Sequence, residues 1–132
     1  MPSRFFIDTS VFLHSLEGKN ACRTLIEERG KEKVVTLDVI KELYRVLKRN
    51  LHGNEARIQE VLDIAREECR VAPKADANRA HEYKLRDKGD LLILAGAVRE
   101  KCDYLVSEDY RLREDAKKYI KAVTAGEALK VT

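Results

Sequence analysis

The segment RFFIDTSVF, from Arg4 to Phe12, decides how the rest of the chain is interpreted. Three apolar or aromatic residues lead directly to Asp8, and a Thr-Ser pair follows before the chain becomes apolar again. The apolar run has the composition of a buried strand. A carboxylate at the edge of a core costs several kcal/mol unless another group pairs with it. The sequence therefore predicts that Asp8 has a partner, supplied by a distant part of the chain.

Predicted strands and helices alternate along the chain. The residue patterns predict strands at 4–7, 34–36, 70–72, 104–106 and 119–123. They predict helices at 11–16, 20–29, 38–50 with Asp38 as N-cap, 58 to near 69, 77–84, 91–98 and 112–118, and a last short helix begun by the capping box of Thr124 and Glu127. This alternation predicts an α/β fold with a mostly parallel sheet covered by helices on both faces.

Four acidic residues are predicted to gather at one end of this sheet. Asp8 and Asp109 each follow a predicted strand, and ligands collect at the carboxyl ends of parallel strands. Glu42 lies beside the apolar stripe of its helix, and Asp90 precedes an almost wholly apolar helix. Clustered carboxylates repel each other unless a cation joins them, and Mg²⁺ or Mn²⁺ suits such oxygen ligands. These ions activate water for phosphodiester hydrolysis.

The composition indicates one soluble globular domain. The chain has 132 residues, 44% of them hydrophobic and 37% charged, with a net charge of +3. The absence of Trp and the 6% aromatic content argue against an aromatic platform for nucleic acid. The three cysteines are separated and form no CxxC pair, which predicts a reducing, cytoplasmic location. Neither a signal peptide nor a membrane-spanning run is expected.

Four motifs occur in an order that resembles the PIN-domain nuclease family. They are FFIDTSVF, TLDVIKELYRVL, GDLLILAGAV and YLVSEDYRL, and YIKAVTAGEAL resembles the family's last strand and helix. The resemblance covers essentially the whole chain and implies a single PIN-like domain over residues 1–132 with a five-stranded sheet. It implies that acids holding Mg²⁺ or Mn²⁺ cut single-stranded RNA. Carried over by position, these catalytic and metal-binding acids are Asp8, Glu42, Asp90 and Asp109, supported by Thr9, Ser10 and Ser107.

The small size resembles the toxin halves of VapC-type toxin–antitoxin pairs. That resemblance implies a small antitoxin partner and a homodimer, in the cytoplasm and without a membrane. A housekeeping RNA-processing nuclease is the alternative enzyme. The non-enzymatic alternative is a PIN-like interaction module that keeps the fold without using the metal.

Each candidate residue also has a structural interpretation. Asp8, Asp90 and Asp109 could be helix N-caps, and Glu42 could pair with Arg45 or Arg49 at helical spacing. Asp87 competes with Asp90 for the role of third acid. The three histidines lack metal-ligand spacing. Four basic residues near the expected site are candidates for contacts with RNA phosphates: Arg86, Lys88, Arg111 and Arg113.

Overall fold

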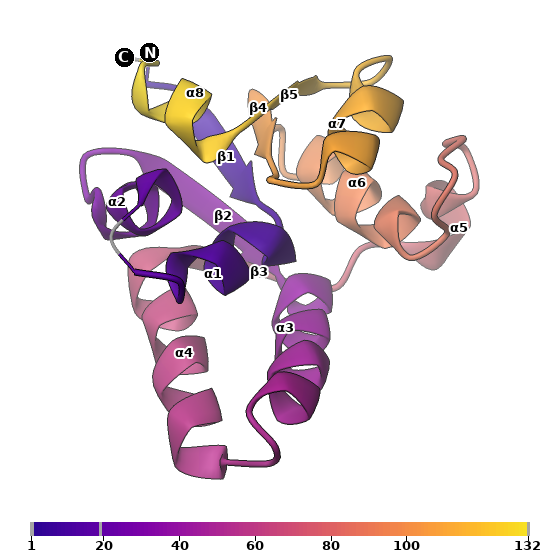
Figure 1. Ribbon diagram of the computed structural model, residues 1–132. Helices are drawn as coiled ribbons and strands as arrows, with labels where there is room; N and C mark the ends of the chain where they lie inside the picture. The colour runs from indigo at the N-terminus through magenta and orange to yellow at the C-terminus, as the bar shows by residue number, and fades with distance from the viewer. Residues whose placement is uncertain (1, 19, 132) are drawn as a thin grey trace.

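A parallel five-stranded sheet forms the centre of the computed structural model, which describes residues 2–18 and 20–131 (Figure 1). The strand order is β3-β2-β1-β4-β5, and all four strand pairs are parallel. The strands are β1 (Arg4–Ile7), β2 (Glu32–Thr36), β3 (Arg70–Ala72), β4 (Tyr104–Val106) and β5 (Lys121–Val123). The predicted α/β class and the parallel sheet are confirmed. Residues 1 and 132, the predicted ends of the domain, lie outside the described residues.

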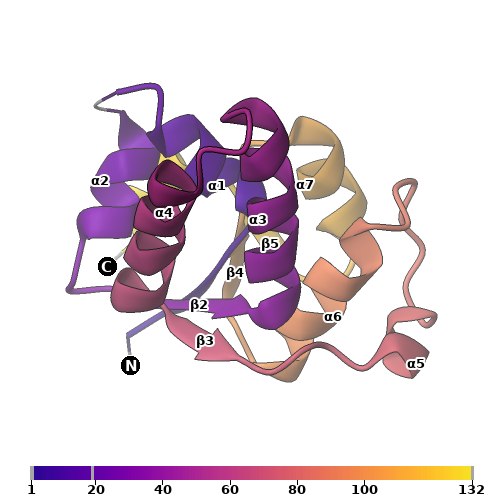
Figure 2. The same ribbon diagram turned by 90° about the horizontal axis from the view of Figure 1, so that it is seen from below.

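Helices cover both faces of the sheet. They are α1 (Thr9–Ser15), α2 (Ala21–Glu27), α3 (Leu37–Asn50), α4 (Glu55–Glu68), α5 (Ala77–Ala80), α6 (Asp90–Arg99), α7 (Tyr110–Ala116) and α8 (Ala125–Leu129). Helix α2 packs against α4 and α8 on one side, while α5, α6 and α7 lie on the other (Figures 1 and 2). Helix α3 contacts α1, α4 and α6, so it closes one end of the molecule. In the described residues, no helix has the length and apolar character needed to cross a membrane.

The strand register places the predicted acidic residues at the same edge of the sheet. Ile7 of β1 pairs with Val106 of β4. The pairing continues one residue further, because the Asp8 amide donates to the Val106 carbonyl at 3.0 Å. Asp8 and Ser107 therefore lie side by side just beyond the carboxyl ends of two central strands, although 99 residues separate them in sequence.

Helix α6 lies unusually close to the sheet at Gly96. A Cβ atom at this position would be 2.8 Å from the Thr36 Cγ2 and 3.6 Å from the Phe6 ring. Thr36 and Phe6 are both fully buried. The close approach fixes the position of α6, whose first residue is Asp90.

Several predicted helix boundaries are wrong; helix α1 begins at Thr9 rather than residue 11, and α4 begins at Glu55 rather than residue 58. Helix α3 begins at Leu37 with Thr36 as its N-cap, because β2 runs straight into the helix. Asp38 therefore lies in the first turn, where its Oδ2 accepts from the Ala75 amide at 2.8 Å. Helix α5 ends at Ala80 rather than residue 84. Helix α7 begins at Tyr110, directly after Asp109.

Candidate functional site

All four predicted acids line one cavity at the carboxyl ends of the strands. This cavity, called the acidic pocket below, has a volume of about 260 Å³. Its lining comprises the carboxylates of Asp8, Glu42, Asp87, Asp90 and Asp109 together with Thr9, Ser10, Leu13, Arg45, Val46 and Gly89. The acids come from the ends of β1 and β4, from α3, and from the start of α6. The fold thus brings together carboxylates that are far apart in the sequence.

Asp8 is almost fully buried, and two serine hydroxyls hold one of its oxygens. The Oδ2 atom accepts from Ser10 Oγ at 2.7 Å and from Ser107 Oγ at 2.8 Å. It also accepts the Ser10 amide, so Asp8 is the N-cap of α1. Burial raises the pKa of Asp8, and the two hydroxyl contacts oppose that rise. Since every one of these bonds uses Oδ2, the Oδ1 atom stays available to a ligand.

Ser107 links the two strand-end acids. Its hydroxyl donates to Asp8 and also accepts the Asp109 amide at 3.0 Å. Asp109 is itself the N-cap of α7, because its Oδ1 accepts the amides of Arg111 and Leu112. The N-cap interpretation is therefore correct for both Asp8 and Asp109. A cap uses one carboxylate oxygen, so it is compatible with a second role for the other.

Asp90 has a strongly perturbed ionisation. It is not an N-cap, because Gly89 occupies that position. Burial and the negative charges of the neighbouring acids, Asp8 first, raise the pKa of Asp90 to about 7. Asp87 contributes to this repulsion, but its Oδ1 is engaged by the Gly89 amide at 2.9 Å. Within the described residues, no positive charge offsets the repulsion that Asp90 experiences.

Glu42 faces the acidic pocket from α3. Burial raises the pKa of Glu42, and the charge of Asp8 adds to the rise. The nearby Thr9 hydroxyl and the positive charge of Arg45 oppose this rise in the pKa of Glu42. Within the described residues, the buried Thr9 Oγ1 has no hydrogen-bond partner at normal bonding distance. Glu42 also forms no salt bridge with Arg45 or Arg49 in the part of the chain that the structure describes. The alternative interpretation of Glu42 as an ion-paired helix acid is therefore wrong.

The acidic pocket fits a divalent cation bound largely through water. Among the described residues, no three His, Cys, Asp or Glu side chains form a ready-made metal-ligating group. Mg²⁺ commonly keeps several waters and takes only one or two carboxylates directly. Asp8 can supply one direct ligand through its available Oδ1. The mutual repulsion of the five carboxylates also favours a cation among them. The residues that would hold the ion are Asp8, Asp90, Asp109 and Glu42.

We expect Asp90→Asn to stabilise the metal-free protein. The folded-state pKa of Asp90 lies above its ordinary value of 3.8, so its ionisation costs more in the folded than in the unfolded chain. In the wild type without metal, the free energy of unfolding should fall as pH rises from about 4 to about 7. In Asp90→Asn, the contribution of Asp90 to this fall should be absent. Because Asp90 is partly exposed, we discount the effect to about 1 kcal/mol. Urea unfolding in EDTA across this pH range measures it.

The matched control for this prediction is Asp76→Asn. Asp76 caps α5 through the Asn78 amide and does not line the acidic pocket. Asn caps helices as well as Asp does, so its stability should remain close to that of the wild type. Equal pH profiles for Asp90→Asn and the wild type would show that the acids do not repel each other.

Sequence reasoning considered Arg45 only as an ion-pair partner of Glu42 and did not place it among the basic residues of the site. Arg45 lines the acidic pocket, one helical turn after Glu42, and this spacing was the signal that could have identified it. Two of the four expected basic residues are engaged elsewhere. Arg86 pairs with Asp115 at 2.9 Å, and Arg113 donates to the Ser107 carbonyl at 2.8 Å. Arg113 therefore helps to hold the loop that carries Asp109.

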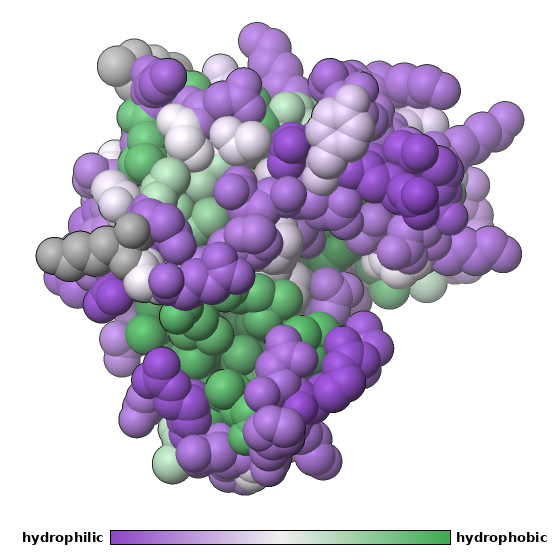
Figure 3. Space-filling model, viewed as in Figure 1, coloured by the Kyte–Doolittle hydropathy of each residue, from purple (hydrophilic) through white to green (hydrophobic). Residues whose placement is uncertain are grey.

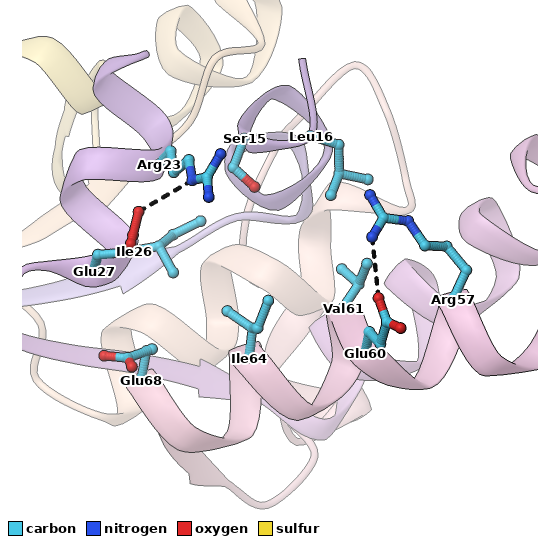
Figure 4. Close-up of a pocket in the computed structure, with 10 residues that line it drawn as sticks. All are labelled: Ser15, Leu16, Arg23, Ile26, Glu27, Arg57, Glu60, Val61, Ile64 and Glu68. Atoms are coloured by element: carbon cyan, nitrogen blue, oxygen red, sulfur yellow. Dashed lines mark hydrogen bonds and ion pairs between the residues drawn. The ribbon is translucent and has the colours of Figure 1, made fainter. Parts of the chain in front are cut away.

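A second concavity lies between α1, α2 and α4, where apolar side chains gather on the surface (Figure 3). Leu16, Ile26, Val61 and Ile64 form its apolar part, and Leu16 and Ile64 are partly exposed to solvent. The ion pairs Arg23–Glu27 and Arg57–Glu60 flank it (Figure 4). This α1–α2–α4 groove shares none of its lining residues with the acidic pocket.

The fold and the acidic pocket define a class of protein: a parallel α/β domain that gathers carboxylates from separate strand ends at one edge of its sheet. The sequence matches the model of the PIN domain family over residues 4–111. The chain therefore belongs to the PIN domain family, as its motifs predicted. No curated protein matches the sequence significantly.

Solved structures with the same fold include proteins of toxin–antitoxin systems. Mycobacterium tuberculosis VapC20, a Sarcin-Ricin loop cleaving toxin, is 18% identical with a TM-score of 0.64, covering 89% of this chain and 97% of VapC20. PAE2754 from Pyrobaculum aerophilum is 15% identical with a TM-score of 0.72, and the match covers 96% of this chain and 87% of PAE2754. A chain of VapBC2 from Rickettsia felis, bound to a promoter DNA fragment, is 14% identical with a TM-score of 0.65. The match covers 92% of this chain and 96% of the VapBC2 chain. Similarity at these identities establishes the fold.

Proposed function

We propose that this protein is a metal-dependent endoribonuclease that cuts single-stranded RNA. The observation that carries the proposal is the acidic pocket, in which Asp8, Glu42, Asp90 and Asp109 converge. Such a cluster has little structural value, because burial and repulsion raise the pKa of its members. PIN nucleases generally use divalent metals, and the four acids occupy the positions that the family motifs assign to ligands.

Each residue has a distinct role in this proposal. Asp8, Asp90 and Asp109 hold Mg²⁺ or Mn²⁺ directly or through water, and Glu42 helps to fix the ion or orients the attacking water. Ser10 and Ser107 keep Asp8 in place by occupying its Oδ2. Bound Mg²⁺ or Mn²⁺ supplies water activation and neutralisation of phosphate charge. Asp90 rather than Asp87 is the third acid, since an oxygen of Asp87 is used in its own turn.

The proposal is tested by incubating the wild type with a mixed pool of structured and unstructured RNAs. Cleavage should occur with Mg²⁺ or Mn²⁺, leave a 5′-phosphate and a 3′-hydroxyl, and stop in EDTA. Persistence of cleavage in EDTA would contradict a metal-dependent reaction. Sequencing of the new 5′ ends would identify the RNA target.

We expect Mn²⁺ to raise the melting temperature of the wild type. An ion that binds only the folded state stabilises it by mass action, by about 1.4 kcal/mol at ten times its Kd. The rise should shrink in Asp8→Asn and Asp109→Asn, and differential scanning fluorimetry with and without Mn²⁺ measures it. Equal rises in these variants and the wild type would place the ion elsewhere.

We further propose that the nuclease is the toxin of a toxin–antitoxin pair. Two of the structurally similar proteins, VapC20 and VapBC2, come from such systems. The exposed apolar α1–α2–α4 groove offers a surface on which a small antitoxin can pack. In this proposal residues 1–132 form one PIN domain that works as a cytoplasmic homodimer, in keeping with its three free cysteines. An antitoxin reading frame directly upstream would favour this role over RNA processing.

A further inference from the structure

A second cavity adjoins the acidic pocket on the side of α3. It has a volume of about 320 Å³, and its lining consists of Asp38, Lys41, Glu42, Arg45, Gly89, Leu92 and Ile93. Glu42, Arg45 and Gly89 line both cavities. A chain-like ligand that occupies the acidic pocket can therefore continue into this second space, which we call the flanking cavity.

The flanking cavity has an apolar wall and a basic edge. Leu92 and Ile93 of α6 form the wall, and Lys41 and Arg45 of α3 supply the positive charge. This combination suits a nucleotide, whose base is flat and apolar on its faces and whose phosphate is anionic. The single acid that lines this cavity away from the acidic pocket is Asp38, and its Oδ2 already accepts the Ala75 amide.

The basic edge forms no salt bridge in the part of the chain that the structure describes. Both of its residues, Lys41 and Arg45, are exposed. An anion placed there is attracted by both positive charges.

We propose that the flanking cavity binds the nucleotide next to the cleaved phosphodiester of single-stranded RNA, with Arg45 on the intervening phosphate. This assignment rests on the proposed ribonuclease function. Arg45 is suited to the role because it lines both cavities, and a guanidinium binds phosphate through two parallel N–H donors. The base lies against Leu92. Arg45 is thus a substrate-positioning residue that the acidic cluster alone does not provide.

The test is fluorescence anisotropy of a labelled single-stranded oligoribonucleotide of mixed sequence, titrated in EDTA at several KCl concentrations. EDTA prevents turnover, so the readout is binding alone. Arg45→Gln should weaken binding about five- to tenfold at low salt. Loss of one phosphate contact should also reduce the slope of log K against log salt by about 0.7. Leu92→Ala should weaken binding with an unchanged slope, because it removes an apolar contact.

The matched control is Arg66→Gln, which removes the same charge from α4. Arg66 is exposed and lines neither cavity, and its Nη1 lies 3.9 Å from Asp63 Oδ1. The RNA affinity of this variant and the salt dependence of that affinity should therefore match those of the wild type. Wild-type affinity in Arg45→Gln or in Leu92→Ala would overturn the assignment, even if the wild type cleaves RNA with Mn²⁺. Failure of the wild type to bind RNA in EDTA at any salt concentration would also overturn this assignment, whereas the ribonuclease itself is tested separately by cleavage with Mn²⁺.

Discussion

Asp8→Asn and Asp109→Asn are each expected to reduce RNA cleavage by roughly a thousandfold or more while leaving the fold intact. Both residues supply charge to the acidic pocket, and Asn removes that charge without changing the shape of the side chain. The amide oxygen of Asn can still accept the capping hydrogen bonds from Ser10 and Arg111. Cleavage rates with Mn²⁺, together with circular dichroism and melting temperature, separate lost chemistry from lost structure.

The controls for this prediction are His14→Ala and His81→Ala. Of the described residues that line the acidic pocket, none is a histidine, so both variants should cut RNA at nearly the wild-type rate. A large loss in either would indicate a histidine general base. Undiminished cleavage by Asp8→Asn would remove the acid cluster from the mechanism altogether.

Gly96→Ala is expected to destabilise the protein by about 2–3 kcal/mol, although alanine is the better helix former. The new methyl group would be 2.8 Å from Thr36 Cγ2, and Thr36 is fully buried and cannot move aside freely. Helix α6 must then shift away from β2 and take Asp90 with it. We therefore expect the affinity for Mn²⁺ to fall together with the midpoint of urea unfolding.

Gly126→Ala is the matched control for Gly96→Ala. Gly126 is also helical, but a Cβ there would meet no atom closer than the Thr124 Oγ1 at 3.9 Å. This variant should be neutral or slightly more stable, because alanine favours the helix. If Gly96→Ala behaved in the same way, the close packing of α6 on β2 would not constrain the site.

The order of strands and helices could be predicted from the sequence because each strand is a short apolar run between amphipathic helices. The same local patterns located the four acids relative to the strand ends, and all four line the acidic pocket. Local patterns also identified the capping box of Thr124 and Glu127, which the structure confirms. These features depend on residues within a few positions of each other, so a sequence displays them directly.

Features that depend on tertiary contacts were missed. Helix α5 ends early because Tyr83 packs edge-to-face on Tyr119 and the Lys84 amide donates to the Tyr119 hydroxyl. The bonds of Ser107 to Asp8 follow from the register of β1 on β4, which no local pattern encodes. Lys33 is buried and donates to the carbonyls of Leu25, Ile26 and Glu28 at the C-terminal end of α2. An isolated lysine at the start of a strand gives no sign of that role.

The double use of Asp8 and Asp109 has an evolutionary consequence. Each starts a helix with one oxygen, and asparagine keeps that acceptor while lacking the charge and the second acceptor oxygen that we assign to catalysis. An aspartate codon becomes an asparagine codon through a single base change. A gene of this kind can therefore lose its enzymatic activity in one mutational step and still encode a folded protein, which leaves an inactive copy available for a purely binding role.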